Sequence, residues 1–134
     1  MAGPSKILLD THIWIWWLNG SPNLPSRLRN LLDSSGTEGL CVSAISCWKM
    51  AKLVANGRLG LTIPVEAWIR TALQPPKKLL ALTPEVAVES TRLPGDFHRD
   101  PADQIIVATA RLLHCRLMTL DAQIQKYPHV ELVT

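Results

Sequence analysis

The stretch Lys6-Ile7-Leu8-Leu9-Asp10 decides the fold of this chain. Its three consecutive apolar residues lack the polar alternation of a strand with one wet face. They therefore predict a short strand that is buried on both faces and ends at the acid. Similar apolar runs cover residues 40–42, 79–82, 117–120 and 130–133. We expect five short buried strands in all.

Between these runs, apolar residues return at helical spacing and capping signals mark the beginnings of helices. Thr83-Pro84 and Asp100-Pro101 each place a capping side chain before a proline at the first helical position. Helices are expected at 11–18, 24–32, 45–54, 65–73, 86–93 and 105–113, with a short one ending at Tyr127. Strands that alternate with helices throughout predict a parallel sheet with helices on both faces.

Length and composition predict a small globular protein. Its 134 residues, of which 47% are hydrophobic and 19% charged, predict one domain that spans residues 1–134. No apolar run reaches the roughly 18–20 residues that cross a bilayer, so a soluble protein without membrane contact is expected. The net charge of +3 permits contact with a polyanion without predicting it. Cys41, Cys47 and Cys115 form no CxxC pair and predict reduced thiols in a cytoplasmic protein.

Four acids are expected at one edge of the predicted sheet. Asp10 ends the first strand and Asp121 ends the fourth, while Asp100 and Asp103 begin a helix. In an open parallel sheet, ligands bind beyond the carboxyl ends of the strands. At about 4 Å and an effective dielectric constant of about 20, two carboxylates repel by about 4 kcal/mol, so either some are protonated or a divalent cation compensates. Oxygen ligands favour Mg²⁺ or Mn²⁺, which serve phosphoryl chemistry.

A purely structural role is open for each acid taken alone. Asp10, Asp100 and Asp121 each stand at the start of a predicted helix and fit an N-cap. Asp103 fits this role less well, because the first turn already has its cap, although an acid there also interacts favourably with the helix dipole. The joint placement of the four acids favours a metal site over separate caps.

Five stretches, in the same order along nearly the whole chain, carry a resemblance to a known family. They cover residues 8–12, 42–48, 57–59, 93–103 and 118–121. Together they resemble a PIN-domain protein of the VapC toxin type. The resemblance implies a three-layer α/β/α fold with a central five-stranded parallel sheet. It further implies a Mg²⁺- or Mn²⁺-dependent endoribonuclease that acts on RNA as the toxin of a toxin–antitoxin pair, forms a homodimer and is blocked by a cognate VapB-type antitoxin.

The resemblance also assigns roles to the acids. By position, Asp10, Asp103 and Asp121 match the acidic cluster of the family, which implies that they hold the metal ion. Asp100 matches an acid often found beside that cluster. The implied catalytic set is therefore Asp10, Asp100, Asp103 and Asp121.

Lys49 departs from the family pattern, which places a glutamate there. Its ammonium either pairs with the carboxylates and takes the place of the cation, or extends away and leaves a weaker metal site. Exchanging an acid for a cation changes the local charge by two units, so weakened metal affinity is expected. The alternative function is a catalytically impaired PIN domain that binds RNA or antitoxin. Gln104, where similar sequences often carry arginine, is a milder departure.

The tryptophans are interpreted as packing residues. Trp14, Trp16 and Trp17 are expected in the core or at a dimer surface, with stacking on RNA bases as the rival interpretation. Trp48 and Trp68 are expected in the core. The apolar surface of the early helices predicts a homodimer and a groove for a helical antitoxin segment.

Histidines near the acids receive no catalytic role. His98 and Arg99 precede Asp100 and fit either a contact to RNA phosphate or an ordinary exposed loop. His12 is left unassigned, because metal-assisted hydrolysis needs no histidine base.

Overall fold

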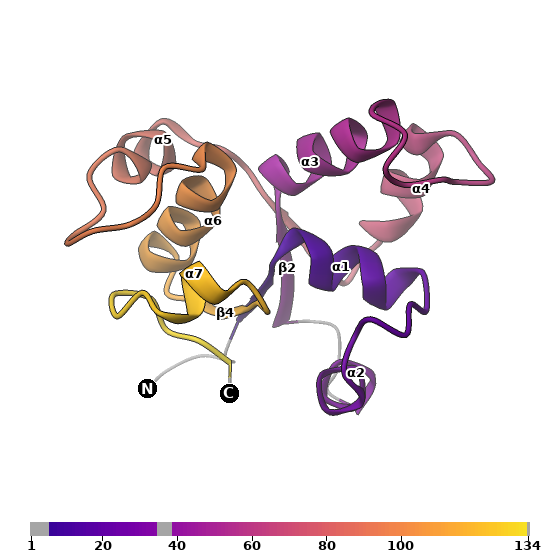
Figure 1. The fold of residues 1–134 in the computed structure, drawn as a ribbon, viewed down its shortest axis with the longest axis horizontal. Helices are drawn as coiled ribbons and strands as arrows, with labels where there is room; N and C mark the ends of the chain where they lie inside the picture. Colours follow the sequence, from indigo (N-terminus) through magenta and orange to yellow (C-terminus); the bar gives the residue numbers. More distant parts are fainter. Residues whose placement is uncertain (1–5, 35–38, 134) are drawn as a thin grey trace.

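A four-stranded parallel sheet forms the centre of the computed structural model, which describes residues 6–34 and 39–133 (Figure 1). Its strands are β1 (Ile7–Leu9), β2 (Leu40–Ser43), β3 (Lys78–Leu80) and β4 (Arg116–Met118), in the order β3-β2-β1-β4. Leu8 of β1 lies opposite Cys41 on one side and Leu117 on the other. The parallel sheet predicted from the apolar runs is confirmed.

Helices connect the strands much as the capping signals predict. They are α1 (Thr11–Leu18), α2 (Ser26–Ser34), α3 (Ala44–Ala55), α4 (Val65–Ala72), α5 (Pro84–Ser90), α6 (Pro101–Leu112) and α7 (Ala122–Gln125). α6 begins at Pro101 rather than at residue 105, because Asp100 accepts a hydrogen bond from the Asp103 amide at 3.0 Å and caps this earlier turn. Within the described ranges, no helix has the length and apolar character to cross a membrane.

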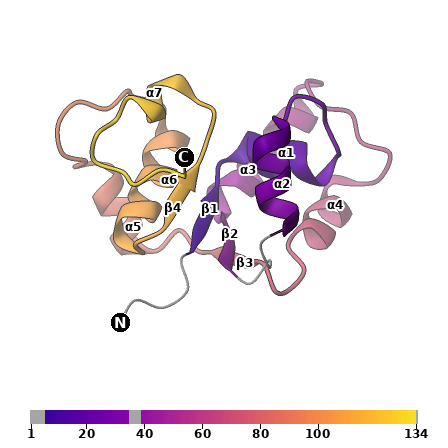
Figure 2. The same ribbon diagram turned by 90° about the horizontal axis from the view of Figure 1, so that it is seen from below.

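Alternating side chains of the strands separate two apolar clusters. Leu9 packs on one face with Trp14 of α1, Met50 of α3 and Trp68 of α4. Leu8, one residue earlier, points to the other face and packs among α6 and α7. Figure 2 shows α1 to α4 on one side of the strands and α5 to α7 on the other. The result is the expected three-layer α/β/α arrangement.

The fifth predicted strand, at 130–133, is a single parallel bridge between Leu117 and Leu132. The backbone groups of Arg116 and Met118 are hydrogen-bonded on the other side, toward β1 and the residues that flank it. In β4, only the backbone N–H and C=O of Leu117 are therefore available to pair with a further strand. The expectation of a five-stranded sheet is wrong in this one strand. The expectation that every strand is buried is wrong for β3, an edge strand whose residues are exposed or half-buried.

Trp48 is placed differently from the sequence expectation. Trp14 is fully buried and Trp68 is 9% exposed, as expected, and the other two tryptophans of α1 pack half-buried against the same cluster. Trp48 is 55% exposed, so the expectation that it lies in the core is wrong. Residues two apart on a helix face different sides, and on α3 it is Met50 that points inward.

Candidate active site

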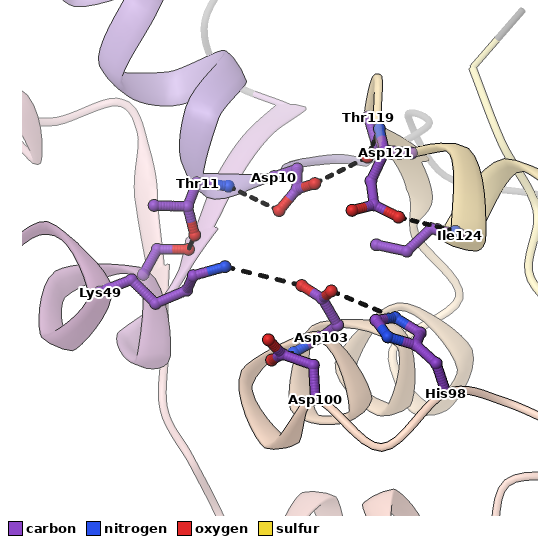
Figure 3. A network of polar contacts seen from close by, with 10 residues as sticks. Asp10, Thr11, Lys49, His98, Asp100, Asp103, Thr119, Asp121 and Ile124 are labelled. Atoms are coloured by element: carbon purple, nitrogen blue, oxygen red, sulfur yellow. Dashed lines mark hydrogen bonds and ion pairs between the residues drawn. The ribbon is translucent and has the colours of Figure 1, made fainter. Parts of the chain in front are cut away.

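The ends of β1 and β4 bring two of the predicted acids together. Asp10 directly follows β1, Asp121 lies just beyond β4, and Leu9 pairs with Met118 in the register of these neighbouring strands. The first turn of α6 carries Asp103 to the same place. In Figure 3 the carboxylates of Asp10, Asp103 and Asp121 point toward one shared space. The structure therefore brings these three acids into one cluster.

Hydrogen bonds hold Asp10 in a fixed orientation. This residue is 5% exposed, its Oδ1 accepts from the Thr11 amide at 2.8 Å, and its Oδ2 accepts from the Thr119 hydroxyl at 2.6 Å. The Thr119 oxygen in turn accepts from the Asp121 amide at 3.0 Å. Thr119 therefore ties the two strand-end acids to each other, and the carboxylate of Asp10 keeps further lone pairs for a cation.

Helix capping accounts for part of the acidic cluster. Asp121 caps α7 by accepting from the Ile124 amide at 3.0 Å, and Asp10 precedes α1 as its N-cap. Asp100 is exposed and caps α6. Asp103 caps no helix, so its burial beside three other acids has no structural role of this kind to explain it. This contrast singles out Asp103 as the residue whose placement most favours a functional site.

Asp103 lies at the electrostatic centre of the cluster. Its side chain is only 8% exposed, and the pKa of the carboxyl is raised to about 6. Burial is the largest cause, the ammonium of Lys49 opposes it, and the negative charges of Asp100, Asp10 and Asp121 add to it. The two oxygens face different partners, because Oδ1 lies 3.6 Å from Lys49 Nζ and Oδ2 lies 3.2 Å from His98 Nε2.

Lys49 pairs with a carboxylate of the cluster instead of extending away from it. It projects from α3 into the acidic cluster, with 22% of its side chain exposed (Figure 3). Its positive charge therefore neutralises part of the carboxylate charge from within the protein.

His98 belongs to the cluster, although its sequence context fits a phosphate contact and an ordinary exposed loop equally well. His98, Asp103 and Asp121 each offer one potential ligand atom, and these atoms all lie within 4.8 Å of one another. Asp10 lies beside this group rather than in it, close enough for its charge to act on Asp103. A nitrogen and two carboxylates suit a divalent cation, so the residues present fit a metal ion. The sequence signal was the position of His98, two residues before Asp100. Only the path of the loop turns its ring toward Asp103.

The PIN domain family matches residues 7–130 of the chain. The chain belongs to the PIN-domain family. It is also 34% identical to Ribonuclease VapC22 of Mycobacterium tuberculosis (strain ATCC 25618 / H37Rv). The match extends over 130 residues and covers 97% of this chain and 98% of that protein. The resemblance to the VapC type, drawn from the short sequence stretches, is thereby confirmed.

Solved structures share the fold of this PIN domain. DNA-bound VapBC from Salmonella typhimurium superimposes with a TM-score of 0.71 at 16% identity, covering 97% of this chain and 98% of that one. A toxin–antitoxin complex from Klebsiella pneumoniae superimposes with a TM-score of 0.67 at 21% identity, covering 96% of this chain and 97% of that one. VapBC2 from Rickettsia felis, bound to a promoter DNA fragment, superimposes with a TM-score of 0.70 at 15% identity, covering the same shares of the two chains. At these identities the likeness concerns the fold.

A cavity of about 190 Å³ opens beside the acids of this PIN domain. Asp10 and Asp121 line one part of it, and His12, Trp16 and Leu120 are among the residues that line the rest. Asp10 and Asp121 are thus reachable from outside through a partly apolar opening. Such an opening suits a substrate with both charged and flat unsaturated groups.

Proposed function

We propose that this PIN domain is an endoribonuclease that acts as the toxin of a toxin–antitoxin pair and depends on Mg²⁺ or Mn²⁺. The observation that carries the proposal is the convergence of Asp10, Asp103 and Asp121 at the strand ends. It occurs in a chain that is 34% identical to a protein named a ribonuclease. The substrate is an RNA phosphodiester, and the three free cysteines support a reducing, cytoplasmic setting.

Each acid has its own part in this proposal. Asp10, Asp103 and Asp121 would hold the ion, which when bound would supply an activated water and neutralise charge on the phosphate. The Thr119 hydroxyl orients both strand-end acids, because it donates to the Asp10 carboxylate and accepts from the backbone amide of Asp121. Asp100 uses Oδ1 to cap α6, which leaves its second oxygen to assist from the exposed rim.

An RNA cleavage assay, with the metal first removed from the protein and then added back, tests the proposal. After treatment with a chelator the protein should cleave a fluorescent single-stranded RNA only when Mg²⁺ or Mn²⁺ is added. Asp103→Asn should lower the rate about 100-fold, because a metal contributes several kcal/mol to stabilising the transition state. Glu66→Gln, which removes an exposed acid on α4, is the matched control and should leave the rate unchanged. Equal rates with and without metal would contradict the proposal.

Lys49 favours a second candidate, a catalytically impaired PIN domain that binds RNA or antitoxin. The observation behind it is the 3.6 Å separation between Lys49 Nζ and Asp103 Oδ1, which supplies within the protein the positive charge that a cation would bring. A domain of this kind should bind labelled RNA without cleaving it at any Mg²⁺ or Mn²⁺ concentration. The same RNA assay therefore distinguishes the two candidates.

Partners of the proposed toxin are a VapB-type antitoxin and a second copy of the chain. The antitoxin is suggested by the solved neighbours, which are named as toxin–antitoxin complexes. The homodimer is supported by an apolar hollow to which Ile45 and Trp48 of α3, Leu82 and Pro101 contribute. Trp48 and Leu82 are among the most exposed apolar side chains. Covering them in a dimer would remove this apolar surface from water.

A further inference from the structure

We propose that His98 is a direct ligand of the divalent ion, so that Nε2 of His98 joins carboxylate oxygens of Asp103 and Asp121. The centre would then be a mixed nitrogen–oxygen site. Imidazole suits transition ions, whereas Mg²⁺ prefers oxygen ligands, so such a centre selects Mn²⁺ and later transition ions such as Co²⁺ over Mg²⁺. The inference rests on the proposed metal dependence but adds a ligand and a metal class to it.

The distance between His98 and Asp103 matches the spacing of neighbouring ligands around a bound ion. His98 Nε2 and Asp103 Oδ2 are 3.2 Å apart, and an atom of Asp121 lies within 4.8 Å of each ligand atom. An octahedral ion with bonds of about 2.1 Å places adjacent ligands about 3.0 Å apart. The His98 and Asp103 atoms therefore already stand at nearly the spacing of neighbouring ligands.

The Nε2 atom of His98 is buried without a hydrogen-bond partner among the described residues. Its short distance to Asp103 Oδ2 lacks the geometry of a hydrogen bond. A buried polar nitrogen in this state costs free energy unless something else contacts it. An ion between the nitrogen and the carboxylate would satisfy both.

The loop that carries His98 is held in place by contacts with its neighbours. Gln104 Nε2 donates to the backbone oxygen of His98 at 3.1 Å. The ring of Phe97 lies 4.5 Å from that of His98 and 4.8 Å from that of Tyr127. Gln104 is one of the two departures from the family pattern, and here it fixes the backbone of the proposed ligand. These contacts restrict the loop and hold the ring of His98 near Asp103.

Lys49 directs the ion toward His98. Its ammonium lies beside Oδ1 of Asp103, so the oxygen that remains for a cation is Oδ2, on the His98 side. A cation near Oδ1 would be repelled by the ammonium. Both departures from the family pattern, Lys49 and Gln104, therefore favour a centre that includes the histidine.

An ion pair between a protonated His98 and Asp103 is the rival interpretation of the 3.2 Å contact. A protonated imidazole has no lone pair for a metal, so the two interpretations differ in what binds the ion. Pulsed electron paramagnetic resonance of the full chain with Mn²⁺ distinguishes them, because a directly bonded nitrogen produces ¹⁴N modulation of the Mn²⁺ signal. The unsubstituted protein is sufficient for this measurement.

The variants are His98→Gln and a matched control, His12→Gln. His12 lines the cavity beside Asp10 and Asp121 but is outside the group of candidate ligands. Mn²⁺ and Mg²⁺ affinities are measured by titration, with circular dichroism to verify folding. Loss of an outer partner of a metal ligand typically weakens binding 10- to 100-fold, so loss of a ligand should weaken Mn²⁺ binding by about tenfold or more. Mg²⁺ affinity should change much less.

The inference is supported if the parent protein and His12→Gln both show ¹⁴N modulation of the Mn²⁺ signal. His98→Gln should lose that modulation and bind Mn²⁺ more weakly. Mn²⁺ bound without ¹⁴N modulation would overturn the inference while leaving the proposed nuclease intact. An Mn²⁺ affinity that is the same in parent and His98→Gln would also overturn it. A parent that binds no Mn²⁺ would overturn both the inference and the metal dependence of the proposed function.

Discussion

At the scale of single residues, the opposed influences on Asp103 set the properties of the site. Burial and three neighbouring carboxylates raise its pKa, while the ammonium of Lys49 lowers it. The net result is a pKa of about 6. Changing the Lys49 charge or the Asp103 charge should therefore alter metal binding and stability in predictable directions.

Lys49→Glu should raise Mg²⁺-dependent RNA cleavage above that of the parent protein. The new carboxylate restores repulsion within the cluster and with it the demand for a divalent ion. Thermal stability should then depend on Mg²⁺ or Mn²⁺, with a gain of about 2.7 kcal/mol at 100 times the dissociation constant. RNA cleavage assays and thermal melts with and without metal measure both effects.

Two controls accompany Lys49→Glu. Adding Asp10→Asn should abolish the gain, because it removes a carboxylate from the same cluster. Lys52→Glu makes the same charge change at an exposed position of α3 and should not increase cleavage. A parent protein that cleaves as fast as Lys49→Glu at saturating metal would contradict the inactivating role of Lys49.

Stability without metal should fall as the pH rises from about 4 to 6, to the extent that Asp103 controls it. Its pKa is about 6 in the folded protein and 3.8 in the unfolded reference, so the folded state retains the proton longer. The stabilisation is therefore complete below about pH 3.8 and lost as the pH passes 6, a change on the order of 2–3 kcal/mol. Urea unfolding in a chelator at pH 4.5 and 7 measures it.

Asp103→Asn isolates the contribution of this carboxyl, because the amide resembles the protonated acid and does not titrate. The variant should be more stable than the parent at pH 7, and the two should converge toward pH 4. Parallel pH profiles for the two proteins would show that Asp103 titrates normally.

At the scale of elements, α6 depends on its first turn to deliver Asp103. Pro101 occupies the first helical position and Asp100 caps the turn, while Ile106 and Val107 anchor the helix in the core. The cap and the acidic cluster therefore share the residue Asp100. Its two roles are separable by substitution.

Asp100→Ala should lower the free energy of unfolding by about 1 kcal/mol, because the Asp103 amide loses its acceptor. Asp100→Asn keeps an oxygen for the cap and should stay close to the parent in stability. RNA cleavage should fall in both variants if the carboxylate assists the reaction. Full RNA cleavage activity in Asp100→Asn would show that Asp100 only caps α6 and does not assist the reaction.

At the scale of the whole molecule, several large apolar side chains remain on the surface. Trp48 is 55% exposed, Leu82 is 44% exposed, and both line the hollow beside the start of α6. A second copy of the chain is the proposed cover. The site and the proposed dimer surface would then be close together, because Lys49 directly follows Trp48 on α3.

Trp48→Glu should shift the chain from dimer toward monomer, because a carboxylate in an apolar contact lacks a partner. Sedimentation velocity at micromolar concentration is the measurement. Ile63→Glu changes a 45% exposed apolar residue outside the hollow and should leave the association unchanged. A parent protein that sediments as a clean monomer would count against the dimer.

The sequence by itself determined the order of the elements and the edge where the acids meet. The apolar run at residues 7–9 suits a strand buried on both faces, and parallel strands bring their carboxyl ends to one edge. Asp10 and Asp121 follow from that rule alone. The burial of Trp68 likewise agrees with its place on the apolar face of a predicted helix.

Only the tertiary structure decided where long side chains and loops point. Lys49 had two outcomes of similar plausibility, and the position of α3 relative to α6 selected the one inside the cluster. His98 entered the site because Gln104 and Phe97 fix its loop, and Trp48 remained outside because α3 turns Met50 inward. Local patterns specify which residues are buried, whereas such orientations depend on contacts between residues far apart in the sequence.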